Sequence, residues 1–252
     1  MELLPNRASY RLGDAITLEA RGAAAGGEVT VWRLGDRVET IAWDGSGAVA
    51  LGWLPEGGYG VELRVGDEIA RTAVEVRQRD RSRLRYGFVV DYSPGRDLDG
   101  IADTVRRLHL TGIQFYDWAY RHADLLGGGE EYRDALDQPI ALRTVRALVA
   151  AVQEAGADAL GYAAVYAVGQ EDWERWRHRA ILTASGEPYA LGDFLFLLDP
   201  AAEDWLASFV DQLAAAAERV GFDGFHLDQY GYPKRARRAD GEVVDVAASF
   251  AA

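Results

Sequence analysis

The fold is decided by one stretch near the C-terminus, Gly221-Phe222-Asp223-Gly224-Phe225-His226-Leu227-Asp228-Gln229-Tyr230-Gly231. Apolar Phe225 and Leu227 alternate with polar residues, and this period of two predicts a strand with one apolar and one polar face. An Ala-rich helix pattern, Trp205 to Val220, comes directly before it, which is the helix-then-strand order of a parallel α/β sheet. Asp228 is therefore expected near the carboxyl end of a strand, where (β/α) barrels place their chemistry.

Two interpretations of Asp228 are open. In the structural one, the side chain only caps a loop or pairs with a nearby Arg. In the functional one, it takes part in a reaction. The functional interpretation gains support because three strand ends earlier in the chain carry similar polar and aromatic residues.

The first part of the chain, residues 1–78, is predicted to be all-β. Short alternating runs follow one another without a helical period, and turn sequences such as Asp44-Gly45-Ser46-Gly47 separate them. The predicted strands are 15–20, 29–32, 38–43, 59–65 and 70–76. Such spacing is typical of a small β-sandwich of immunoglobulin-like type, to which we assign no chemistry.

Three tryptophans, Trp32, Trp43 and Trp53, lie in this domain. They could stack on sugars, but packing in the core or between the sheets is the simpler interpretation and the one we expect. A charged connector from Arg77 to Arg83 follows, and we expect it to be a solvated linker rather than a binding patch.

In residues 84–252, strand patterns alternate with helix patterns. The predicted strands are 86–92, 112–118, 160–166 and the opening stretch, and the helices between them are 101–108, 142–155 and 205–220. Four such units indicate a (β/α) barrel or an open doubly wound sheet. No Gly-rich fingerprint follows the first strand, which argues against a dinucleotide-binding fold.

Polar and aromatic side chains gather at the four predicted strand ends. They are Asp91 and Tyr92, then Tyr116, Asp117 and Trp118, then Tyr162 and Tyr166, then His226, Asp228 and Gln229. If these ends meet at one barrel mouth, they form a cup of carboxylates and aromatic rings with few cations. Sugars fit such a cup, because Asp and Gln bind hydroxyls while apolar ring faces lie on Trp and Tyr. Core packing is the alternative for each aromatic residue taken singly.

A glycosidase needs two carboxyl groups across the scissile bond. Asp228 is the candidate nucleophile. His122, in the loop after the second strand, could orient a substrate hydroxyl, and an exposed loop histidine without a role is the alternative.

The composition restricts the partners. There are 27 Lys and Arg against 40 Asp and Glu, a net charge of −13, which argues against a nucleic acid or an anionic membrane as partner. Cys is absent and the four His show no metal-binding spacing, so we expect no metal site and no cofactor. The N-terminus does not have the pattern of a signal peptide, and no apolar run reaches membrane-spanning length, which leaves the compartment open.

Six segments carry a family resemblance: GFVVDYS (87–93), GIQFYDWAYRHADLLGG (112–128), DALDQPI (134–140), GYAAVYAVG (161–169), GEPYALGDFLFLLDP (186–200) and FDGFHLDQYG (222–231). They resemble glycoside hydrolase family 66, the dextranases and cycloisomaltooligosaccharide glucanotransferases. The resemblance implies an immunoglobulin-like domain before a (β/α)8 barrel, and retaining action on α-1,6-glucan. It also implies that Asp228 is the nucleophile, the residue that the strand-end argument selects.

One departure from the family concerns the acid/base. In the family this Glu lies on a strand well downstream of the nucleophile, whereas the present chain ends at Ala252 after four predicted units. We therefore expect the first half of a barrel, truncated before the acid/base, with an unpaired strand edge that favours self-association. The loop acids that could replace it are Glu130, Glu131, Glu171 and Glu187, each expected first as a solvated surface charge.

The function predicted from the sequence is that of a retaining glycoside hydrolase or transglycosylase acting on an oligo- or polysaccharide of the dextran type. A carbohydrate-binding or interaction fragment without catalytic activity is the alternative. These segments do not decide between hydrolysis and cyclisation as the parent reaction.

Overall fold

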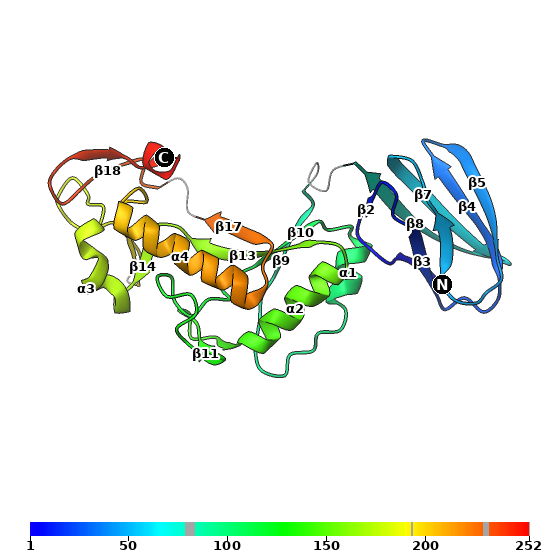
Figure 1. The fold of residues 1–252 in the computed structure, drawn as a ribbon, viewed down its shortest axis with the longest axis horizontal. Coiled ribbons are helices and arrows are strands. Elements are labelled where there is room, and N and C mark those ends of the chain that lie inside the picture. The colour runs from blue at the N-terminus through cyan, green and yellow to red at the C-terminus, as the bar shows by residue number, and fades with distance from the viewer. Residues whose placement is uncertain (79–83, 193, 229–231, 252) are drawn as a thin grey trace. The chain divides into compact units, whose positions relative to one another are not determined.

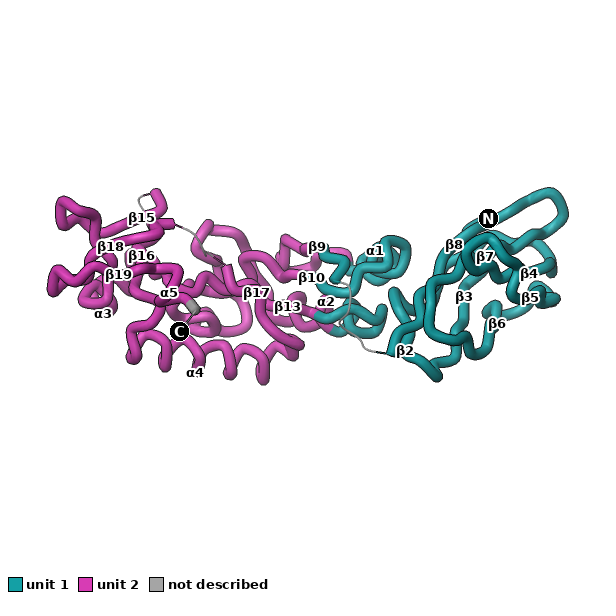
Figure 2. Tube along the Cα trace, turned by 90° about the horizontal axis from the view of Figure 1, so that it is seen from above, with its two compact units in different colours: residues 1–87, 98–113, 150–158 teal, residues 88–97, 114–149, 159–252 magenta. Residues whose placement is uncertain are grey.

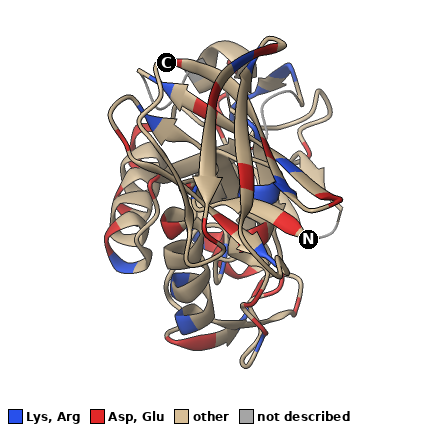
Figure 3. Ribbon diagram, turned by 90° about the vertical axis from the view of Figure 1, so that its right-hand side faces the viewer, with Lys and Arg blue, Asp and Glu red and all other residues tan. Residues whose placement is uncertain are grey.

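The structure is a computed structural model that describes residues 1–78, 84–192, 194–228 and 232–251 (Figure 1). Its contacts divide the chain into two compact units (Figure 2). Unit 1 comprises residues 1–87, 98–113 and 150–158, and unit 2 comprises residues 88–97, 114–149 and 159–252. Asp and Glu occur in strands, helices and loops of the chain, with Lys and Arg interspersed among them (Figure 3). None of the described helices is both long and apolar enough to cross a membrane.

Two sheets formed by strands β1 to β8 of unit 1 enclose one apolar core. One sheet has the strand order β1 (Glu2–Pro5), β3 (Ile16–Arg21) and β6 (Val49–Gly52). The other has the order β2 (Tyr10–Arg11), β8 (Glu68–Arg77), β7 (Gly57–Val65), β4 (Gly27–Arg33) and β5 (Asp36–Trp43). Inward side chains of both sheets, such as Ile16, Leu18, Val31 and Leu63, form the core. Five strands match the predicted runs, whereas β1, β2 and β6 are too short to show a period in the sequence.

The prediction that the three tryptophans pack inside is wrong for two of them. Trp53 is 77% exposed and Trp32 is 36% exposed, whereas half-buried Trp43 packs against the core. Trp53 follows the end of β6, and Trp32 points away from the core because Val29 and Val31 on the same strand occupy the inner face.

The prediction of a solvated connector is wrong for its first residue, Arg77. It is the last residue of β8, only 5% exposed, and its Nη2 donates to Oε2 of Glu75 at 2.5 Å. A buried guanidinium needs such a partner. Most of the predicted connector, residues 79–83, lies outside the described residues.

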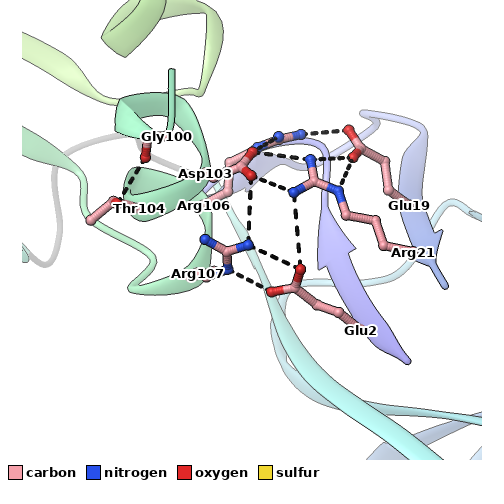
Figure 4. Close-up of polar contacts among 8 residues, drawn as sticks. All are labelled: Glu2, Glu19, Arg21, Gly100, Asp103, Thr104, Arg106 and Arg107. Carbon is pink, nitrogen blue, oxygen red and sulfur yellow. Dashed lines mark hydrogen bonds and ion pairs between the residues drawn. The ribbon is translucent and has the colours of Figure 1, made fainter. Parts of the chain in front are cut away.

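An ion-pair cluster holds helix α1 (Ile101–Arg107) to strands β1 and β3 within unit 1 (Figure 4). Arg106 binds Glu19 at 2.7 Å, and Arg107 binds Glu2 at 2.5 Å. Both Arg21 of β3 and Arg106 of α1 bind the carboxylate of Asp103. The cluster contains three carboxylates and three guanidinium groups, so its formal charges balance.

A further sheet contains the strands that were predicted to alternate with helices. Its order is β17 (Gly224–Asp228), β13 (Asp158–Ala164), β10 (Gly112–Phe115) and β9 (Tyr86–Val89). Strands β13 and β17 pair in parallel, and the helices α2 (Leu142–Glu154) and α4 (Glu203–Val220) precede them in the chain. The carboxyl ends of all four strands belong to unit 2.

Strand β17 differs from its prediction on the apolar face. Phe225 is half-buried, but Leu227 is 49% exposed. The reason is that β17 is an end strand of this sheet among the described residues, so fewer side chains are available to cover Leu227.

The rest of unit 2 consists of small sheets and short helices around an apolar core that includes Tyr166, Leu197, Trp205 and Phe209. The small sheets are β14 (Ala167–Gly169) with β16 (Leu195–Leu197) and β15 (Ala190–Leu191), β11 (Glu131–Arg133) with β12 (Pro139–Ala141), and β18 (Arg235–Arg237) with β19 (Val243–Asp245). The short helices are α3 (Trp173–Trp176), α5 (Val246–Ala251) and the 3₁₀ turns Gln170–Asp172 and Arg177–Arg179.

Candidate active site

The register between β13 and β17 places three polar side chains on one face of the sheet. Tyr162 lies opposite His226, and their rings stack with centroids 6.4 Å apart. Asp228 is two residues further along β17 and therefore shares that face. The hydroxyl of Tyr162 donates to Oδ2 of Asp228 at 3.0 Å. Burial, followed by the charge of Asp228, raises the pKa of Tyr162, so this hydroxyl keeps its proton and remains a donor.

Tyr116 and Asp117 follow β10 and extend this group of residues. The ring of Tyr116, which is 42% exposed, lies 4.8 Å from the ring of Tyr162. Asp117 has a φ of 50° and Asp91, after β9, has a φ of 68°. Residues other than glycine rarely adopt this left-handed conformation, and Asp and Asn are the most tolerant of it. Such backbone strain is concentrated at functional sites.

Asp117 is a carboxyl group with a perturbed pKa. Burial raises the pKa of Asp117 to about 6, and the negative charges of Asp134 and Asp228 add to this effect. Asp117 is therefore largely protonated in mildly acidic solution and ionised at neutral pH. It can donate a hydrogen bond in the first state and only accept in the second.

Asp134 is the site residue that the sequence argument missed. Its side chain is buried, and Oδ1 accepts hydrogen bonds from the backbone N–H groups of Leu136 at 2.9 Å and Gln138 at 2.7 Å. These bonds fix the loop between β11 and β12 beside Asp117. The segment 134–140 belongs to the family resemblance, but no predicted strand precedes it, because β11 has only three residues, so periodicity offered no reason to select Asp134.

Two cavities adjoin these carboxylates. One, of about 170 Å³, is lined by Tyr116, Asp117, His122, Asp134 and Tyr162 and by the apolar side chains Leu191, Phe194 and Leu195. The other, of about 510 Å³, shares Tyr116, Asp117, Asp134 and Leu136 with the first and adds Asp91, Tyr92 and Gln138. Carboxylates, phenol rings and apolar walls are the surfaces that a neutral polyhydroxylated ligand requires.

The model of glycosyl hydrolase family 66 matches residues 5–252. The chain belongs to glycosyl hydrolase family 66. Two curated relatives, both cycloisomaltooligosaccharide glucanotransferases from Niallia circulans, are 23% identical over 97% of the chain and 24% identical over 77% of it. The chain spans 29% and 22% of their lengths.

A solved structure has the same fold as this family 66 chain. It is a cycloisomaltooligosaccharide glucanotransferase from Paenibacillus sp., crystallised with cycloisomaltoheptaose, and it superposes with a TM-score of 0.85 at 22% identity. The match covers 99% of the present chain and 41% of the Paenibacillus chain. The resemblance derived from the six sequence segments is thus confirmed.

Three of the predicted substrate-binding residues of this family 66 chain are buried. Trp118 donates from Nε1 to the carbonyl of Tyr162 at 3.1 Å, and Tyr166 donates its hydroxyl to the carbonyl of Tyr232 at 2.9 Å. Neither lines the two cavities, so we expect both to support the site rather than contact a substrate. Tyr92 lines the larger cavity, but its hydroxyl donates to the carbonyl of Val89 at 2.8 Å.

The remaining predicted residues have different surroundings. Asp91 is exposed, lines the larger cavity and accepts from the backbone N–H of Ser93 at 2.9 Å; hydrogen bonds from the side chain and then from the backbone of Ser93 lower its pKa. His122 lines the smaller cavity, where its buried Nδ1 has no hydrogen-bond partner and burial lowers its pKa. It is thus not the exposed loop histidine of the alternative interpretation. Gln229 lies outside the described residues.

Among the residues that the structure describes, no group of three or more His, Asp or Glu side chains is arranged to hold a metal ion.

Proposed function

We propose that this chain carries the nucleophile half of a retaining family 66 glycosidase or transglycosylase acting on α-1,6-glucan, with Asp228 as nucleophile. Its architecture in this proposal is an immunoglobulin-like β-sandwich, residues 1–78, followed by a partial (β/α) barrel, residues 84–252. The proposal rests chiefly on the hydrogen bond to Asp228 from Tyr162, which lines the smaller cavity together with Asp117; Asp228 itself lines neither cavity.

In this proposal, Asp228 acts as the nucleophile that attacks the anomeric carbon. One carboxylate oxygen forms a bond to the anomeric carbon while the glycosidic C–O bond breaks, and the departing oxygen takes a proton from a second carboxylic acid. Water or a sugar hydroxyl then attacks the anomeric carbon, loses its proton to that second group and releases Asp228. The first outcome is hydrolysis and the second is transglycosylation.

Tyr162 supports this role in the ground state and during the reaction. Its O–H···O bond is accepted by Oδ2, so it holds the carboxylate in one orientation and leaves Oδ1 for the attack. The flat faces of Tyr116 and Tyr162 offer stacking surfaces for a sugar ring. Asp117 is suited to bind sugar hydroxyls, as donor below about pH 6 and as acceptor above it.

A second candidate function is carbohydrate binding without turnover. The acidic residues that line the two cavities favour it. They are Asp91, Asp117 and Asp134, and none of the lining residues is a Glu. Asp91 and Asp134 are engaged with backbone amides, which leaves Asp117 as the acid with a raised pKa.

Release of reducing ends from dextran separates the two candidates. The first function requires that the unmodified chain itself supply the second carboxylic acid; it then predicts activity that falls by at least about a thousandfold in Asp228→Asn, because the amide is a poor nucleophile. Asp137→Asn is the matched control, since Asp137 is an exposed loop residue. Dextran binding without any release of reducing ends would favour the second function, and full activity of Asp228→Asn would refute the nucleophile assignment.

A further inference from the structure

A hollow of about 470 Å³ lies in unit 1, and it shares no lining residue with the candidate active site. Its floor is the outer face of strands β7 and β8, and its other lining residues include Arg85, Leu108 and His109. This volume is within the range of small-ligand sites. The hollow exists because the outward positions of the two strands carry almost no side chain.

The strand register shows which positions these are. Tyr59 and Val61 face the core, so Gly58 and Gly60 of β7 face outward, next to Glu75 and Ala73 of β8. A Cβ atom placed on Gly58 would meet nothing within 4 Å, and one on Gly60 would meet only Cβ of Trp32, at 3.8 Å. Two adjacent glycine positions thus leave open space beside an aromatic side chain.

Trp32 lies next to Gly60, just outside the residues that line the hollow. It lies opposite Gly60 in the pairing of β4 with β7, faces away from the core and is 36% exposed. No packing role inside the sandwich accounts for a tryptophan in this position. An exposed indole beside a flat row of glycine and alanine is a stacking surface for an apolar ring face.

On its polar side, the hollow is lined by Arg85 and Glu75, which form an ion pair. Arg85 donates from Nη1 to Oε2 of Glu75 at 2.6 Å and from Nε to the carbonyl of His109, while Nη2 has no hydrogen-bond partner. Burial opposes ionisation of Glu75, but hydrogen bonds from Arg77 and Arg85 outweigh it and lower the pKa. Burial, then the charge of Arg85, lowers the pKa of His109. Arg85 and Glu75 therefore contribute opposite charges to the lining, and His109 is neutral.

We infer that this hollow is a second carbohydrate site, in which a glucan segment lies over Gly58, Gly60 and Ala73, stacks on Trp32 and hydrogen-bonds to Glu75 and Arg85. A lining in which a carboxylate lies beside the guanidinium group, next to an exposed indole, suits a neutral hydroxylated chain better than an anion. The choice of a glucan rests on the proposed function. Such a site would retain a polymer whose other segments are in the candidate active site, by raising their effective concentration.

Selective labelling of the glycines with ¹⁵N tests the inference on the whole chain. During a titration with a linear isomaltooligosaccharide, the amide signals of Gly58 and Gly60 are expected to shift. Gly161, next to Tyr162, reports on the candidate active site in the same spectra. Shifts at Gly161 alone would overturn the second site and leave the proposed function intact. Shifts at Gly58 and Gly60 alone would support the second site and count against the proposed function.

Substitution of Gly60 supplies the decisive variant. Gly60→Val places a side chain in the hollow; its Cβ meets only Cβ of Trp32, at 3.8 Å, and valine suits a strand. We expect the response of Gly58 to disappear and binding at this site to weaken by about tenfold or more. Trp32→Ala is expected to weaken binding similarly. Thr40→Val, at an exposed position of β5 in the same sheet, is the matched control and should bind like the unmodified chain.

The anion alternative is part of the same experiment. Inorganic phosphate should leave Gly58 and Gly60 unshifted, since the carboxylate of Glu75 lies beside Arg85 and repels an anion. A stronger response to phosphate than to the sugar, or an unchanged sugar response in Gly60→Val, would overturn the inference.

Discussion

Tyr162 donates its hydroxyl hydrogen to Oδ2 of Asp228 at 3.0 Å, from the strand next to the one that ends in Asp228. The two residues are 66 positions apart in the chain, and the parallel register of β13 with β17 brings them together. A rigid sheet thus orients the carboxylate, which is more precise than orientation by a loop.

Removal of this hydrogen bond is expected to reduce activity. Tyr162→Phe keeps the ring beside Tyr116 and His226 but deletes the donor, and bonds to charged groups contribute about 1.5–3 kcal/mol. We expect kcat/KM on dextran to fall by about 10- to 100-fold, and the melting temperature to fall by several degrees because the same bond contributes to stability. Tyr120→Phe, a tyrosine outside the Asp228 contact, is the control. An unchanged kcat/KM would contradict a role for Tyr162 in orienting Asp228.

Asp117 makes stability depend on pH. Its pKa is about 6 in the folded chain and close to 4 when unfolded, so the folded state binds more protons between these values. The contribution is fully present below about pH 4 and is lost as the pH rises through 6. Asp117→Asn, which tolerates the φ of 50°, should therefore stabilise the chain at pH 7 by up to about 3 kcal/mol and much less at pH 4.

Urea unfolding at several pH values measures this difference. The matched control is Asp137→Asn, because Asp137 also has a left-handed backbone, with a φ of 63°, but is exposed. A gain in the free energy of unfolding that does not vary with pH would show that charge burial at Asp117 is not its cause.

The ion-pair cluster of Figure 4 should make unit 1 sensitive to salt. Hydrogen bonds from Arg21, and then from Arg106, lower the pKa of Asp103, since burial opposes them only in part. Asp103→Asn leaves three guanidinium groups with two carboxylates. We expect a loss of about 1 kcal/mol in the free energy of unfolding at low salt, and less at high salt.

The contribution of this cluster to stability also depends on pH. Because the folded pKa of Asp103 lies below its unfolded value, its contribution is present above about pH 4 and is lost as the pH falls further. Thermal unfolding at low and high salt, with Asp67→Asn in an exposed turn as control, measures both effects. Equal losses at low and high salt would argue that Asp103 acts through packing instead.

Gly161 occupies a closely packed position in the middle of β13. A Cβ atom there would lie 2.9 Å from the rings of Phe222 and Phe225. Gly161→Ala is expected to destabilise the chain by about 1–3 kcal/mol, because the rings must shift. Gly58→Ala, where the new atom meets nothing within 4 Å, is the control and should be close to neutral. Equal stability of both variants would contradict this packing.

Much of the local structure could be predicted from the sequence. The alternation of Phe225 and Leu227 with polar neighbours predicts the strand that became β17, and the Ala-rich run before it became α4. These features depend on hydrogen bonds and side-chain directions within a few residues, which periodicity records. Short strands such as β2 and β6 were missed because two to four residues are too few to show a period.

The candidate site was predicted in part for the same reason. Strand ends led to Tyr116, Asp117 and Asp228, which the structure brings together, but also to Trp118 and Tyr166, which are buried. Asp134 could not be found this way, because a loop folds back to place it near Asp117.

By itself, the sequence determined the family and the order of the longer strands and helices, and it supplied the proposal that Asp228 is the central carboxylate, since these depend on neighbouring residues and on short motifs. Only the tertiary structure decided that Tyr162 binds Asp228, that Asp117 has a raised pKa and that Trp32 is exposed beside Gly60. The physical reason is that a period of two shows which side chains share a face of a strand. Which face becomes covered, and by what, depends on segments far away in the chain.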